Sequence, residues 1–114
     1  SGWNINLGNQ NIWELDLLSF DSDIYLDNIK LKNSEISGTG IIYLGKNLEM
    51  EELKINGNFD INVSTDLPLV AIGNVDVPAS WINATIGYLN QADTVYKIKV
   101  IVEDGSNVRF FDDK

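Results

Sequence analysis

The segment from Val95 to Val102 has the most regular alternation of side-chain types in the chain. It reads VYKIKVIV, so apolar side chains occupy every even position, while Lys97 and Lys99 occupy odd positions. Because side chains of a β-strand alternate between the two faces of a sheet, this pattern predicts a strand with one strongly apolar face. Such a face has to be covered, so we expect a fold built from sheets.

Matching apolar positions predicts two neighbours for this strand. If residues 80–89 form a strand, Tyr88 lies opposite Tyr96 and the apolar face continues across the pair. A turn after the strand would place Val100 opposite Phe110 on its other side. The segment is therefore expected to be central in an antiparallel sheet. Residues 80–89 also fit a short helix, but their β-branched residues favour the strand.

A hairpin is predicted where Asn and Gly separate two alternating segments. A three-residue loop, Asn56–Asn58, pairs Ile55 with Phe59, and it pairs Leu53 with Ile61. Each pair joins apolar to apolar, whereas a two-residue loop would mix apolar and polar side chains. Asn and Gly also tolerate the backbone conformations that such loops require.

The alternation changes phase in the first third of the chain. Ile24 and Leu26 would lie on one face of an extended chain. Ile29 and Leu31 would lie on the opposite face. A β-bulge near Asp27-Asn28 would return all four to one face, and a tight turn at the same place is the alternative.

Glycines interrupt the next strand-like segment, ISGTGIIYL, which runs from Ile36 to Leu44. Gly38 and Gly40 share one face of this segment. Glycine within a strand often marks a bend or a close approach of another backbone, so we expect one of these here.

The chain as a whole shows about nine or ten short strands with frequent turn signals. No convincing internal repeat is seen. This organisation predicts an all-β fold in which residues 1–114 form a single-domain antiparallel β-sandwich, Ig-like or jelly-roll-like. A small β-barrel is the alternative, and a short helix at 80–89 is compatible with either.

Composition narrows the chemistry. The sequence contains no His and no Cys, so it lacks the usual general base near neutral pH and every thiolate ligand. Its net charge of −9 disfavours nucleic acid and anionic membranes as partners. No apolar run approaches the roughly 20 residues of a membrane-spanning helix. We therefore expect a non-enzymatic protein that has no nucleic-acid partner and does not insert into a membrane.

Calcium is the one cofactor that the sequence makes conceivable. Asp21, Asp23 and Asp27 supply hard oxygen ligands close together in the chain. The spacing of an EF-hand is missing, and Asp also favours turns for local reasons. The expectation without calcium is that no cofactor is bound.

Aromatic residues are the most plausible binding groups. Trp81, Trp3, Tyr25 and Tyr43 could form a platform for sugar rings or an anchor for a protein. Trp81 would point outward if residues 80–89 form a strand, opposite the apolar set. The alternative for tryptophan in a sandwich is a place in the core.

These observations lead to a functional hypothesis. We expect a binding or assembly module that recognises a protein or a polysaccharide within a larger extracellular, cell-surface or viral assembly. One alternative is an acidic inhibitor that occupies a basic nucleic-acid-binding site. Another is a structural subunit that forms homo-oligomers through its edge strands.

Overall fold

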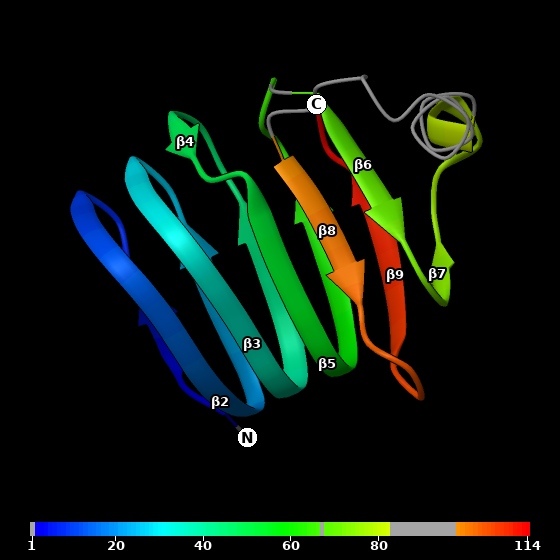
Figure 1. The fold of residues 1–114 in the computed structure, drawn as a ribbon, viewed down its shortest axis with the longest axis horizontal. Helices are drawn as coiled ribbons and strands as arrows, with labels where there is room; N and C mark the ends of the chain where they lie inside the picture. The colour runs from blue at the N-terminus through cyan, green and yellow to red at the C-terminus, as the bar shows by residue number, and fades with distance from the viewer. Residues whose placement is uncertain (1, 67, 83–97) are drawn as a thin grey trace.

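The computed structural model describes residues 2–66, 68–82 and 98–114, apart from the side chains of residues 10, 12 and 13. Nearly all of the described secondary structure is β-strand (Figure 1). The elements are β1 (Asn4–Asn6), β2 (Gln10–Leu26), β3 (Ile29–Leu44), β4 (Leu48–Glu49), β5 (Glu52–Val63), β6 (Leu69–Ile72), β7 (Val75–Asp76), the 3-10 helix η1 (Ala79–Trp81), β8 (Ile98–Val102) and β9 (Asn107–Asp112).

The nine strands form one sheet, and all of the pairs between them are parallel. The long strands β2, β3 and β5 bend back on themselves, so each contributes to two facing walls (Figure 1). Ile36 and Ile42 of β3 come from opposite sides of its bend, and both are fully buried between the walls. The fold is therefore a flattened parallel β-solenoid, and the predicted antiparallel sandwich is wrong.

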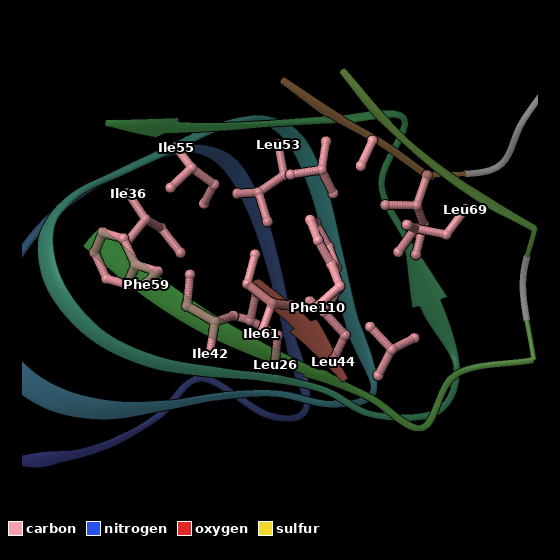
Figure 2. Packing of buried hydrophobic residues seen from close by; sticks show 14 of the residues in the cluster. Leu26, Ile36, Ile42, Leu44, Leu53, Ile55, Phe59, Ile61, Leu69 and Phe110 are labelled. Atoms are coloured by element: carbon pink, nitrogen blue, oxygen red, sulfur yellow. The ribbon is translucent and has the colours of Figure 1, made fainter. Parts of the chain in front are cut away.

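A repeat of 19 residues underlies the solenoid. Each residue of β3 from Ser34 to Leu44 lies beside the residue of β5 that is 19 positions later, as Ile36 lies beside Ile55 and Ile42 beside Ile61. Like side chains thus stack on like side chains along the interior (Figure 2). The statement that the sequence has no internal repeat is also wrong, because each coil is one repeat.

One corner of each of the first three coils is formed by an asparagine. Asn9, Asn28 and Asn47 follow one another at 19-residue intervals, and all have positive φ, from 49° to 59°. The Asn47 side-chain amide donates a hydrogen bond to Oδ1 of Asn28 at 2.7 Å. Asn adopts this left-handed conformation more readily than most residues, so the column of asparagines fixes where each coil turns.

This corner explains the change of phase in the first third of the chain. Leu26 ends β2 and Ile29 begins β3, so Asp27 and Asn28 are the corner between two coils. The apolar residues on both sides of this corner are buried in the interior, which is the placement that the predicted bulge would also have given. The bulge is not present. The chain turns at Asp27-Asn28, as in the alternative, but it joins two long strands of successive coils.

The opposite corner replaces the predicted hairpin. β5 continues without a break from Glu52 to Val63 and bends at Gly57, where φ is 140°. Ile55 and Phe59 do point into the same interior, but from opposite walls. The hairpin is wrong because the strands pair with the preceding coil and not with each other. Gly38 bends β3 in the same way, as expected for a strand glycine.

The last strands are not stacked in chain order. The sheet runs β1-β2-β3-β5-β8-β6, so β8 lies between β5 and β6. β9 lies between β5 and β7 on the other wall. The outermost strands, β6 and β7, therefore come before β8 and β9 in the sequence, although β8 and β9 lie closer to β5.

The described part of the segment predicted as central, Ile98–Val102, is an inner strand, but its neighbours differ from the prediction. Val100 pairs in parallel with Leu53 on one side and with Ala71 on the other. Its predicted partner Phe110 lies in the other wall, beside Ile61. The predicted pair of Tyr88 and Tyr96 lies outside the described residues.

The segment predicted as a strand from residue 80 begins differently. Ala79–Trp81 form the 3-10 helix η1, so the start of that strand is wrong, and residues 83–89 lie outside the described part. Within the described ranges, no helix is long and apolar enough to cross a membrane.

Close stacking at the glycine corner gives a stability prediction. A Cβ added to Gly57 would collide with the carbonyl oxygen of Gly38 in the neighbouring coil. We expect Gly57→Ala to lower the free energy of unfolding by about 3 kcal/mol, since strain and collision add. Urea denaturation of the purified variant measures this loss.

Gly105→Ala is the matched control. Gly105 also has positive φ, at 82°, but nothing lies within 4 Å of an added Cβ. Its substitution should cost only about 1 kcal/mol, from backbone strain alone. Equal losses in the two variants would show that the two coils do not approach closely at Gly57.

Candidate functional site

The two ends of the solenoid differ in how they are covered. At the end formed by β6 and β7, Trp81 of η1 packs edge-on against Phe110, with the ring centroids 5.5 Å apart. Lys114 Nζ lies 5.5 Å from the centroid of the Trp81 ring. Trp81 is only 8% exposed, so it helps to cover this end of the core. Its expected outward position is wrong, because the residue lies on a helix and not on a strand.

The other end has an open sheet edge. β1 pairs only with the second half of β2, where Asn4 lies beside Asp23 and Asn6 lies beside Tyr25. The first half of β2, from Gln10 to Ser19, pairs with β3 on one side. On its other side it has no partner strand in the described part of the chain. An edge of this kind presents unpaired N–H and C=O groups to other polypeptides.

The core is less well covered beside this edge. Leu15 and Leu17 point inward but are only partly buried, whereas Ile36 and Ile55, the equivalents of Leu17 in the next two coils, are fully buried. The described residues therefore give the first coil less apolar cover than the next two coils receive from their neighbours. A further strand placed here would bury the remaining leucine surface.

Exposed apolar side chains gather at the same end. Trp3 is 77% exposed, Leu18 is 62% exposed and Phe20 is 73% exposed. They are three of the five large apolar side chains that are exposed in the described ranges, and all belong to β1, β2 or the residue before β1. Leu18 and Phe20 are two positions apart on β2, and neighbouring exposed apolar side chains of this kind often mark a protein interaction site. We name Leu15, Leu17, Leu18, Phe20 and the free backbone of residues 10–19 the open edge.

A ladder of tyrosines crosses the outer surface of the second wall. The Tyr25 and Tyr43 rings stack with their centroids 4.5 Å apart and their planes 6° apart, because the two residues pair in adjacent coils. Burial, and then the negative charge of Asp23, raise the pKa of the Tyr43 hydroxyl. Asn62 continues the row in the next coil. The stacked rings offer their edges and hydroxyl groups to a ligand more readily than their faces.

An ion pair lies on the same wall. Arg109 donates two hydrogen bonds to the carboxylate of Asp60, both 3.0 Å long. This contact raises the pKa of the Arg109 guanidinium. The Arg109 side chain also lies over the Phe111 ring, 5.6 Å from its centroid. Both residues of the pair are thus engaged within the protein.

The candidate calcium ligands do not converge. Asp21 and Asp23 belong to the bent strand β2, whereas Asp27 lies at the asparagine corner. One oxygen of Asp27 accepts a hydrogen bond from the Lys46 backbone amide at 3.0 Å. An extended chain spaces Asp23 and Asp27 roughly 13 Å apart, too far for one ion. No group of three or more acidic residues in the described ranges could hold a metal ion.

The structure thus separates the predicted binding residues. Trp3 lies beside the second half of β2, where its carbonyl accepts a hydrogen bond from the Asp23 amide at 2.8 Å. Tyr25 and Tyr43 lie on the adjoining wall, and Trp81 lies at the far end. Their roles in binding remain predictions.

The open edge was missed by sequence reasoning, although the sequence carries a signal for it. Leu18 and Phe20 occupy the same alternating positions as Glu14 and Asp16, which face solvent. Two large apolar residues on an otherwise acidic face indicate an outer surface that something else covers.

Comparisons of the chain with family models, with curated proteins and with solved structures found no match.

The raised pKa of Tyr43 predicts a pH dependence of stability. The folded protein holds the Tyr43 proton more tightly than the unfolded chain, whose tyrosines titrate near pH 10.0. The resulting stability is fully present below that pH and is lost as the pH rises through the folded-state pKa. We expect Tyr43→Phe to lose stability less steeply above pH 10.0 than the wild type, measured by urea denaturation.

Tyr25→Phe serves as the control for this prediction. It keeps the Tyr43 hydroxyl but removes the Tyr25 hydroxyl, which also raises the pKa of Tyr43. The alkaline loss should therefore persist in this variant but be smaller in total, because the folded protein raises the Tyr43 pKa by less. An identical alkaline slope in the wild type and Tyr43→Phe would contradict the assignment.

Hydrogen exchange tests whether the edge is open. Every second amide between Glu14 and Leu18 should exchange rapidly, because these amides point away from β3. Amides of Asp23–Tyr25, which β1 covers, should be protected, as should those of Ser34–Ser37 between two strands. NMR-detected exchange measures all three segments together, and uniform protection of residues 14–18 would contradict an open edge.

Proposed function

We propose that this protein is a non-enzymatic protein-binding and assembly module that accepts a strand of another polypeptide along the open edge. The added strand would continue the solenoid by one rung, a form of recognition known as β-augmentation. The proposal is carried by one observation: no strand among the described residues pairs with the outer side of residues 10–19, beside exposed Leu18 and Phe20, while Trp81 covers the opposite end of the core.

The energetics favour this use of the edge. Main-chain hydrogen bonds to the incoming strand would supply affinity, and alternate side chains would supply specificity. Burial of the exposed parts of Leu15, Leu17 and Leu18 would add about 25 cal/mol for each Å² of apolar surface. The absence of His and Cys from the sequence agrees with a binding role.

A saccharide is the second candidate ligand, and it would bind on the tyrosine wall. The observation that favours it is the Tyr25–Tyr43 pair with Asp23 and Asn62 in neighbouring positions, because hydroxyl, carboxylate and amide groups all bond to sugars. Glycan-array binding that is lost in Tyr43→Ala but kept in Leu18→Asp would support it over the open edge.

Selection from a random peptide display library tests the leading proposal. Peptides that bind the folded protein should show alternating apolar residues, as an added strand requires. The double variant Leu18→Asp/Phe20→Asp should lose these peptides, because it places charge at the open edge. A variant with the same added charge at exposed sites elsewhere, Ser64→Asp/Ser80→Asp, should retain them. Enriched peptides without alternation, or equal binding to both variants, would contradict the proposal.

A further inference from the structure

The charges along the first coil define the partner more closely. We infer that the open edge selects an extended segment that alternates basic and apolar residues. This inference rests on the proposed function. The basic side chains would lie over Glu14 and Asp16 on the outer surface, and the apolar side chains would cover Leu15 and Leu17.

The inner coils show which residues stack beside acidic positions in this solenoid. Glu49 Oε2 lies 3.6 Å from Nζ of Lys30 in the preceding coil. Glu52 Oε2 lies 3.9 Å from Nζ of Lys99, its register partner in β8. Asp60 contacts Arg109 at 3.0 Å, again in the adjacent rung. Opposite charges in neighbouring strands attract each other. Each of these three acidic residues, on the outer surface of an inner coil, therefore lies beside a basic residue of the adjacent strand.

The first coil also has acidic residues on its outer surface, but the residues beside them in the next coil are not basic. Glu14 occupies the row of Glu52, two coils earlier, and its neighbour on the inner side is Asn33. Asp16 has the acidic Glu35 as its inner neighbour. None of the ion pairs found in the described part of the chain involves these residues. No strand among the described residues lies on their outer side, where the next rung would be placed.

The strand β8 illustrates the sequence that fits such a row. In the segment Ile98–Val102, Lys99 faces outward beside Glu52, while Ile98 and Val100 are fully buried in the core. An incoming strand with a lysine or arginine over Glu14 would repeat this contact. A second basic residue over Asp16 would also relieve the repulsion between Asp16 and Glu35.

A second copy of this chain is a poorer occupant of the edge. Two copies related by a two-fold axis would bring their edge strands together in antiparallel orientation. Glu14 and Asp16 of one copy would then face the same carboxylates of the other. Like charges directly opposite in a sheet are destabilising, and each chain already carries a net charge of −9.

Two short capped peptides test this inference, one alternating Lys and Val and the other alternating Glu and Val. Binding to the wild-type protein is measured by isothermal titration calorimetry at low and physiological salt. The Lys–Val peptide should bind at least about tenfold more tightly than the Glu–Val peptide. The double variant Glu14→Lys/Asp16→Lys should reverse this preference. The control Asp66→Lys/Asp104→Lys changes the net charge equally at exposed sites in other coils and should keep it.

The outcomes of this experiment distinguish a failure of the charge inference from a failure of the proposed function. If both peptides bind equally and Leu18→Asp/Phe20→Asp abolishes both, the edge accepts strands but the charge inference is overturned. If neither peptide binds, both the inference and the proposed function are overturned. A Lys–Ser peptide that binds as well as Lys–Val would show attraction of charge without an added strand, which also overturns the inference. Self-association in ultracentrifugation that Leu18→Asp removes would identify a second copy as the occupant instead.

Discussion

Parallel pairing between successive coils is the interaction on which the rest of this structure depends. Each rung obtains its backbone hydrogen bonds from the rungs before and after it, so no coil satisfies its polar backbone alone. Residues 19 positions apart therefore become neighbours, and the interior consists of stacked columns such as Ile36 on Ile55. The same dependence means that the outermost rungs of the described part differ from the others, since the described strands pair with each of them on one side only.

The sequence predicted the strands, and which of their side chains face inward, more reliably than it predicted their partners. Ile55 and Phe59 face the same interior in both the predicted hairpin and the observed coil, because alternation has the same period in each. What differs is whether a strand pairs with its sequence neighbour or with a segment 19 residues away. The alternation of side chains is the same for both ways of pairing. The 19-residue spacing of Asn9, Asn28 and Asn47 is the feature of the sequence that distinguishes them.

The candidate site was harder to predict for a related physical reason. Aromatic residues were the predicted binding groups, yet Trp81 is buried against Phe110 while Leu18 is exposed. Exposure here depends on the position of a rung along the solenoid axis, which is a property of the whole stack. The phase of Leu18 relative to Asp16 was visible in the sequence, but its meaning required knowing that this strand ends the sheet.

The two ends of the solenoid also show how a stack can be terminated and where it can be extended. At one end the chain departs from sequential order, places β6 and β7 outermost and covers the core with Trp81. At the other end β1 protects only the half of the rung that bears Tyr25. The other half of this rung has no partner strand on its outer side among the described residues, and it carries acidic and apolar side chains. Acidic side chains repel identical edges while attracting basic strands, so this composition opposes uncontrolled stacking of like molecules and leaves the edge available to a chosen partner.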